Sequence, residues 1–159
     1  MGEAAREILI EKAERSAVHD IYEIGKLCFS DAWREETVAH DMEGSHSEYF
    51  IARVDGKIAG YGCFWFVADE GQLVNIGVVP EYRKRGIGAL ILEAGIKEAE
   101  KRSMRTMFLE VRVSNEEAQR LYGKYGFLNR GTRKGVYELP REDGYIMSRV
   151  IKGELFQSH

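Results

Sequence analysis

Three basic residues and two glycines lie together in the middle of the chain, in the segment Arg83-Lys84-Arg85-Gly86-Ile87-Gly88. They follow a short apolar run at residues 73–79, which ends at Pro80, and a helical pattern then continues to about Arg102. Backbone N–H groups at a helix start have no intrahelical partners, and the helix dipole adds positive charge there. Because glycine lets the backbone approach a phosphate closely, the segment predicts a pyrophosphate-binding loop.

Two common phosphate-binding motifs do not fit this segment. The chain has no Gly-x-x-x-x-Gly-Lys-[Ser/Thr] string, and Ile91 stands where a dinucleotide-binding fingerprint needs its third glycine. The simplest alternative is a charged helix start with flexible glycines and no ligand. Basic side chains at a helix start oppose the dipole unless an anion compensates for them, so the pattern favours a bound anion.

A carboxylate and a phenol further along the chain could perform proton chemistry. Glu110 stands in the middle of residues 105–113, which alternate as a strand with a largely apolar side. A half-buried carboxylate loses solvation, which raises its pKa and makes it a better base. The alternative is a solvent-facing glutamate paired with Arg112 or another neighbour. Tyr122 lies on an apolar helical stripe, where an aromatic side chain is more often part of the core.

Two segments carry a family resemblance. Arg83-x-x-Gly86-x-Gly88, which follows Val-x-Pro, resembles the acetyl-CoA loop of the GNAT N-acetyltransferases. Residues 109–127 look like a second signature of the same superfamily. Their Glu-Val-Arg-x-Ser-Asn and Leu-Tyr-x-x-x-Gly-Phe elements are similar to the branch of ribosomal-protein-alanine N-acetyltransferases. The two signatures cover residues 73–127, and weaker similarity extends to Met147.

The resemblance implies roles for individual residues. Glu110 would be the general base, and Tyr122 would give a proton to the leaving CoA sulfur. Asn115, which is otherwise a natural helix cap, would touch acetyl-CoA. The other contacts with acetyl-CoA that it implies come from the strand backbone and the loop: Ile76, Gly77, Val78, Arg83, Lys84, Arg85, Gly86, Ile87 and Gly88.

Residues 135–147 provide evidence about the acceptor, the molecule that would receive the acetyl group. Family members that acetylate a ribosomal protein carry paired tyrosines ahead of an acidic Glu-Asp segment, and here Tyr137 and Glu142-Asp143 keep that pattern. Val136 stands in place of one tyrosine, and Gly144 stands where alanine is usual. The resemblance therefore assigns acceptor binding to Tyr137.

Trp33 is a second candidate for the acceptor site. It follows the first predicted helix and could line the opposite wall of the site. Plain packing of the helix–loop junction explains it slightly better.

The elements that must position these residues alternate between strands and helices. The patterns predict a strand at residues 7–11, then helices at 17–28 and 35–42, and then an antiparallel meander with a hairpin at Asp55-Gly56. Ser16 is a predicted helix cap, and Ser114-x-x-Glu117 is a predicted capping box. The resemblance implies an α/β fold with a mixed, mostly antiparallel sheet flanked by helices. Its central parallel strands would separate after a bulged strand at residues 73–79.

Length and composition limit the possible functions. The 159 residues predict one domain, and a net charge of −3 argues against nucleic acid as a partner. No apolar run is long enough to cross a membrane, and Met1–Arg6 lack the apolar core of a signal peptide. Two isolated cysteines and four histidines show no metal-ligand spacing, so no metal is predicted. We expect a cytoplasmic protein.

The predicted function is transfer of the acetyl group of acetyl-CoA to the N-terminal α-amine of a protein. The branch resemblance points to a ribosomal protein with an N-terminal alanine. One alternative is acetylation of a small amine such as a polyamine, an amino acid or an aminoglycoside, but the acidic residues are spread rather than gathered for a polycation. The other is a non-catalytic acyl-CoA sensor, which would need neither Glu110 nor Tyr122.

Overall fold

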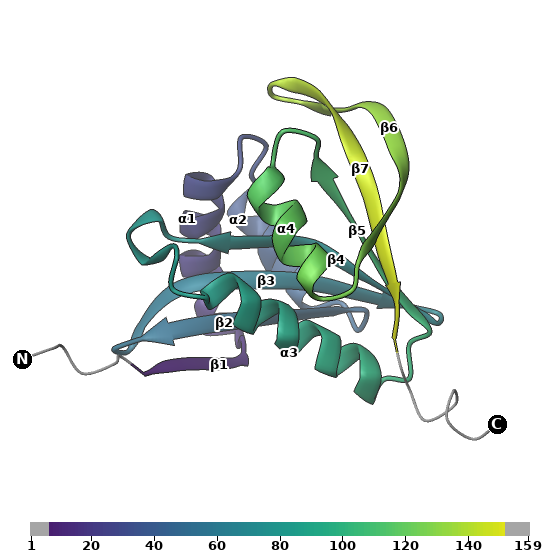
Figure 1. The fold of residues 1–159 in the computed structure, drawn as a ribbon. Helices are drawn as coiled ribbons and strands as arrows, with labels where there is room; N and C mark the ends of the chain where they lie inside the picture. Colours follow the sequence, from purple (N-terminus) through teal and green to yellow (C-terminus); the bar gives the residue numbers. More distant parts are fainter. Residues whose placement is uncertain (1–6, 152–159) are drawn as a thin grey trace, which may run out of the picture. The chain divides into compact units, whose positions relative to one another are not determined.

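A computed structural model describes residues 7–151 of the chain. The expectation about a signal peptide at residues 1–6, and His159 among the histidines, lie outside that range. Seven strands form a mixed sheet in the order β1-β2-β3-β4-β5-β7-β6, and four α-helices accompany it in the described part (Figure 1). The predicted α/β class is confirmed. No helix within residues 7–151 has the length and apolar character needed to cross a membrane.

The predicted order of elements is also confirmed, with shifts of a few residues at their ends. The strands are β1 Ile8–Lys12, β2 Ser47–Val54, β3 Lys57–Val67, β4 Glu70–Val78, β5 Thr106–Arg112, β6 Leu128–Glu138 and β7 Arg141–Val150. The α-helices are α1 Val18–Cys28, α2 Glu35–Met42, α3 Ile87–Lys101 and α4 Glu116–Lys124. Short 3-10 helices at Arg15–Ala17 and Pro80–Tyr82 precede α1 and follow β4.

The chain divides into two compact units. One contains the residues up to Cys63 together with Asn75–Ala94, and the other contains Phe64–Val74 together with the residues from Gly95 onward. Strands β3 and β4 contribute residues to both. That the whole chain acts as one domain stays a prediction.

The first unit has its core on one face of α1 and along β2. Four residues of α1 at helical spacing are buried, and β2 is buried over most of its length. β1 pairs antiparallel with β2, from Ile8 opposite Val54 to Lys12 opposite Phe50. The hairpin predicted after β2 is confirmed, because β2 and β3 are neighbours in the sheet and the turn residues Asp55 and Gly56 have φ angles of 52° and 81°.

The second unit is organised around β5. Met107, Leu109 and Val111 are buried, whereas the residues between them are partly exposed, so the predicted alternation is confirmed. β5 pairs antiparallel with β7 over its full length, and Glu110 lies opposite Ile146. The parallel pairing of β4 with β5 runs only from Glu70↔Thr106 to Leu73↔Leu109. Glu110 therefore lies just beyond the point where these two strands are paired.

Two predicted helix caps are wrong. Ser16 lies inside a 3-10 turn, and the residue before α1 is Ala17, which makes no side-chain cap. At α4 the cap is Asn115 rather than Ser114, since Asn115 Oδ1 accepts a 3.2 Å hydrogen bond from the Ala118 amide. The Asn115 amide in turn donates to the carbonyl of Arg112. This turn delays the start of the helix by one residue.

Candidate active site

The predicted phosphate loop of the first unit connects β4 to α3. The Val79 amide donates to the Ala59 carbonyl at 2.8 Å, which fixes the start of the loop on β3. Lys84 and Gly86 have positive φ angles of 65° and 80°, so left-handed residues alternate with Arg83 and Arg85. A Cβ at Gly86 would meet no atom within 4 Å, so the backbone at Gly86 borders open space. An approaching anion would meet no side chain at this glycine.

The start of α3 supplies amide donors to this loop. The first intrahelical bond runs from the Leu90 amide to the Gly86 carbonyl at 3.1 Å. The amides of Ile87, Gly88 and Ala89 precede that bond, and in an α-helix such amides have no intrahelical acceptor. These three amides are donors that an anion could accept from, and anion binding at the loop stays a prediction.

The three basic side chains of the loop differ in their contacts. Arg83 Nε donates to the Val78 carbonyl at 2.9 Å, and Nη2 donates to Cys28 Sγ at 3.5 Å. Its guanidinium thus connects the end of β4 with the last residue of α1. Arg85 lies over the Tyr82 ring at 5.4 Å from the centroid. Diphosphate binding by Arg83, Lys84 and Arg85 stays a prediction.

The strand before the loop, with Ile76, Gly77 and Val78, is tightly packed at one residue. A Cβ at Gly77 would lie 3.1 Å from Cys28 Sγ and 3.4 Å from the Phe29 ring, which explains the glycine. Just before it, the Oδ1 atom of Asn75 is buried and accepts no hydrogen bond within the described residues. A buried acceptor without a donor is costly, so this atom is suited to a ligand N–H group.

Glu110 in the second unit is half-buried and ion-paired. Its side chain is 26% exposed, and Oε2 accepts a 2.7 Å hydrogen bond from Arg133 Nη1 on β6. Pairing with a neighbour, one of the two readings of the sequence, is therefore observed, but the partner is Arg133 rather than Arg112. The role of Glu110 as base stays a prediction.

Tyr122 on α4 combines packing with a protonated hydroxyl. Its ring contacts Phe127 edge to face at a centroid distance of 6.1 Å, as the core reading of the sequence expects. Burial raises the pKa of Tyr122 to about 12, and the nearby Tyr137 adds to the rise. The phenol therefore remains protonated throughout the neutral range.

The hairpin of β6 and β7 carries Tyr137, the predicted acceptor residue. Arg112 on β5 lies with its guanidinium carbon 4.4 Å from the centroid of the Tyr137 ring. Arg112 also donates to Glu142 Oε1 at 3.1 Å, and the Ser114 amide donates to Glu142 Oε2 at 2.7 Å. Hydrogen bonding from Ser114 holds the pKa of Glu142 below its ordinary value, and Arg112 adds to the effect.

The remaining predicted residues have clear structural positions. Asn115 uses its amide oxygen to cap α4, which is the role that its position at the start of a helix predicted. Its contact with acetyl-CoA stays a prediction. Trp33 is half-buried in the segment between α1 and α2 of the first unit. No group of three or more His, Cys, Asp or Glu residues within 7–151 could hold a metal ion. That the protein needs no metal stays a prediction.

Sequence reasoning gave no functional role to two arginines. It named Arg112 only as a possible partner of Glu110, with which it shares a strand face at a spacing of two. Arg133 gave no signal, because it comes 23 residues after Glu110 and reaches it only through the register of β6 with β7. That register shifts between Asn129 and Gly131, and the sequence pattern does not reveal such a shift.

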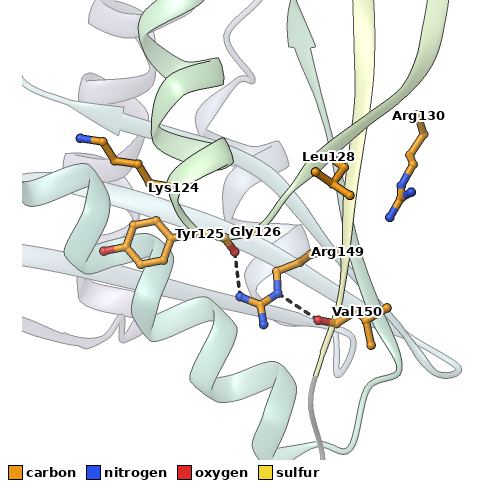
Figure 2. Close-up of a pocket in the computed structure, with 7 residues that line it drawn as sticks. All are labelled: Lys124, Tyr125, Gly126, Leu128, Arg130, Arg149 and Val150. Carbon is orange, nitrogen blue, oxygen red and sulfur yellow. Dashed lines mark hydrogen bonds between the residues drawn. The ribbon is translucent and has the colours of Figure 1, made fainter.

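A cavity of about 570 Å³ lies elsewhere in the second unit, around the end of α4 (Figure 2). It is lined by Lys124, Tyr125, Gly126, Leu128, Arg130, Arg149 and Val150. Arg149 donates to the carbonyls of Tyr125 and Val150, and the charged ends of Lys124 and Arg130 lie apart from it in Figure 2. Because these cations do not converge and no carboxylate joins them, we do not assign the active site to this cavity.

Comparison with known proteins identifies relatives over most of the chain. The model of the Acetyltransferase (GNAT) family matches residues 18–127, a range that includes the loop, Glu110 and Tyr122. The [ribosomal protein bS18]-alanine N-acetyltransferase of Escherichia coli (strain K12) is 36% identical over 144 residues, which cover 89% of this chain and 97% of that protein. An N-alpha-acetyltransferase of Sulfurisphaera tokodaii is 30% identical over 159 residues, covering 92% and 95% of the two chains.

A solved structure gives the same result for the fold. The crystal structure of the ribosomal-protein-S18-alanine N-acetyltransferase from Escherichia coli matches with a TM-score of 0.85 and 34% sequence identity. The match covers 92% of this chain and 95% of that one. The similarity therefore extends well beyond the two sequence signatures.

Proposed function

This chain belongs to the GNAT family of acetyltransferases, and from that premise we propose that it acetylates the N-terminal α-amine of a protein, with an alanine-initiated ribosomal protein as the acceptor. The Escherichia coli relative is named for that reaction on bS18, and the match spans nearly its whole length. The observation that carries the proposal is the half-buried, ion-paired Glu110 on the same strand as Arg112, which contacts the Tyr137 hairpin. The proposed setting is the cytoplasm.

The residues of the loop fit acetyl-CoA, the acetyl donor of this reaction. The amides at the start of α3, the open space at Gly86 and the nearby cations suit a diphosphate. The buried Oδ1 of Asn75 suits an amide N–H, and the pantetheine arm of acetyl-CoA carries such groups. When bound, acetyl-CoA supplies the thioester carbonyl that the amine attacks.

Glu110 would prepare the nucleophile. An α-amine is mostly protonated near neutral pH and must lose a proton before it can attack the thioester carbonyl. The carboxylate of Glu110 accepts that proton directly or through a water molecule. The hydrogen bond from Arg133 Nη1 to Oε2 at 2.7 Å fixes the orientation of this carboxylate.

Tyr122 would assist the leaving group. When the new C–N bond forms and the C–S bond breaks, negative charge collects on the CoA sulfur. A phenol with a pKa of about 12 can always donate a hydrogen bond to that sulfur. Because a thiol has a pKa of about 8.5, full proton transfer from this phenol would be uphill, so we assign Tyr122 mainly hydrogen-bond stabilisation.

Tyr137 would contact the first residues of the acceptor. The two departures from the family pattern lie side by side, since a Cβ at Gly144 would come within 2.9 Å of both Val136 and the Tyr137 ring. Gly144 thus makes room for the ring beside Val136. This arrangement retains an aromatic wall for a peptide N-terminus.

The test is release of free CoA thiol with a panel of acceptors. The panel pairs each peptide that begins with Ala, Ser or Met with its N-terminally blocked copy, and adds a polyamine, an amino acid and an aminoglycoside. We expect the free Ala peptide to react fastest and its blocked copy not to react. Faster turnover of any small amine would contradict the proposal, as would acetylation at a lysine side chain of the blocked peptide.

A further inference from the structure

Arg112 makes an unusually complete set of contacts with the tip of the β6–β7 hairpin. Its Nη1 donates to the Pro140 carbonyl at 2.9 Å and to Glu142 Oε1 at 3.1 Å, and its Nη2 donates to the Leu139 carbonyl at 3.1 Å. The same guanidinium lies 4.4 Å from the centroid of the Tyr137 ring. One side chain of β5 therefore contacts both strands of the hairpin and the turn that joins them.

Glu142 and Gly144 complete this arrangement. Glu142 is held from its other oxygen by the Ser114 amide at 2.7 Å, so the pair ties the hairpin to the turn that begins α4. Gly144 lies opposite Arg112 on β5 and opposite Arg133 on β6. Since a Cβ there would approach the Tyr137 ring to 2.9 Å, a larger residue at position 144 would require the ring to shift.

We propose that Arg112 is a positioning residue, which fixes the hairpin tip and the Tyr137 ring in the conformation that receives the acceptor. The proposal rests on the proposed function, in which Tyr137 binds the acceptor. Holding a binding loop in its bound shape removes the ordering cost that an acceptor would otherwise meet. The planar guanidinium is suited to this role, because its fixed fork can satisfy two carbonyls and a carboxylate at once while its face lies on an aromatic ring.

The proposal predicts a selective defect in Arg112→Lys. Lysine keeps the charge but has no fork or flat face, so it cannot make these contacts together. We expect the KM for the acceptor peptide to rise about tenfold, while the KM for acetyl-CoA stays within about twofold. An equal rise in both constants would overturn the proposal.

Arg149→Lys is the matched control. Arg149 belongs to the same unit and also donates to two backbone carbonyls, those of Tyr125 and Val150, but it contacts neither Tyr137 nor Glu142. We expect it to leave the acceptor KM unchanged. If it raised the acceptor KM as much as Arg112→Lys does, general destabilisation would explain both, and the proposal would fail.

A double-mutant cycle tests whether Arg112 acts through Tyr137. Tyr137→Ala should raise the acceptor KM, and adding Arg112→Lys to it should raise that KM by less than about twofold more, because the ring that Arg112 positions is already gone. Fully multiplicative effects would contradict the proposal.

Amide hydrogen exchange tests the positioning role of Arg112 without depending on which acceptor the enzyme uses. In the ligand-free protein, Arg112→Lys should speed exchange across residues 137–142, whereas Arg149→Lys should not. Peptide turnover by the wild-type enzyme decides the acceptor independently. Unchanged exchange at the hairpin tip would overturn the positioning role even if the enzyme acetylates peptides as proposed.

Discussion

The phosphate loop and the polar face around β5 are built in different ways. The loop, residues 79–88, is continuous in the sequence, and its donors are backbone amides whose directions follow from φ angles and the start of α3. The polar face gathers Glu110, Arg112, Arg133 and Tyr137 from two strands, with contacts between side chains. The loop should therefore be sensitive to backbone conformation, and the polar face to side-chain chemistry. Glu110→Gln tests the polar face, Gly86→Ala tests the loop, and the variants of Tyr122 and Asn115 at α4 sharpen the comparison.

The largest effect is expected from Glu110→Gln. The amide has nearly the shape of the carboxylate but cannot accept the proton of the amine, so kcat/KM near neutral pH should fall by about 10²–10⁴-fold. Acetyl-CoA affinity, measured by calorimetry, should change little. Because the variant also removes the ion pair with Arg133, thermal unfolding must be recorded beside it. Undiminished turnover in a folded variant would remove Glu110 as the base.

Gly86→Ala tests the loop. At a φ of 80° an alanine is strained, and the left-handed conformation costs a non-glycine residue about 1–2 kcal/mol. If the loop needs this conformation to hold the diphosphate, the KM for acetyl-CoA should rise about 5–30-fold. A Cβ at residue 86 meets no neighbouring atom, so a steric clash within the protein cannot explain the change.

Gly56→Ala is the control for that experiment. Gly56 has a φ of 81°, and a Cβ added there would likewise meet no atom within 4 Å, but it lies in the β2–β3 hairpin turn. The variant should lose similar stability and keep its KM for acetyl-CoA. A loop that works through its basic side chains alone would instead tolerate Gly86→Ala and respond to Lys84→Ala.

The same contrast explains what the sequence could predict. Local signals predicted the loop, the Asp55-Gly56 hairpin and the alternation of β5, because each depends on residues close in sequence. Partners on different strands depend on register, and the pairing of Arg133 with Glu110 depends on the register of β6 with β7, which shifts between Asn129 and Gly131. The predicted cap of α4 was wrong by one residue. The Asn115 amide donates to the Arg112 carbonyl, and this turn moves the helix start from Ser114 to Asn115.

Tyr122→Phe should have a smaller effect than either variant above. Removing one hydrogen-bond donor to the departing sulfur should lower kcat by up to about tenfold, as expected for a net hydrogen-bond contribution of about 0.5–1.5 kcal/mol. The edge-to-face contact with Phe127 needs only the ring, so the melting temperature should change little. A large loss of stability with unchanged kcat would show that Tyr122 is purely a core residue.

The smallest effect is expected at Asn115, where a backbone role and a ligand role compete. Asn115→Ala removes the acceptor of the Ala118 amide and should lower the free energy of unfolding by about 0.5–2 kcal/mol. Asn115→Asp keeps that acceptor and suits the positive end of α4, so its stability should match the wild type. Asn115→Asp loses the side-chain NH2 group, however. Weaker binding of acetyl-CoA by this variant would therefore show that this group donates a hydrogen bond to acetyl-CoA. If the affinity of Asn115→Asp for acetyl-CoA is unchanged, Asn115 acts only as a helix cap. The contact with acetyl-CoA that the resemblance implies would then be wrong.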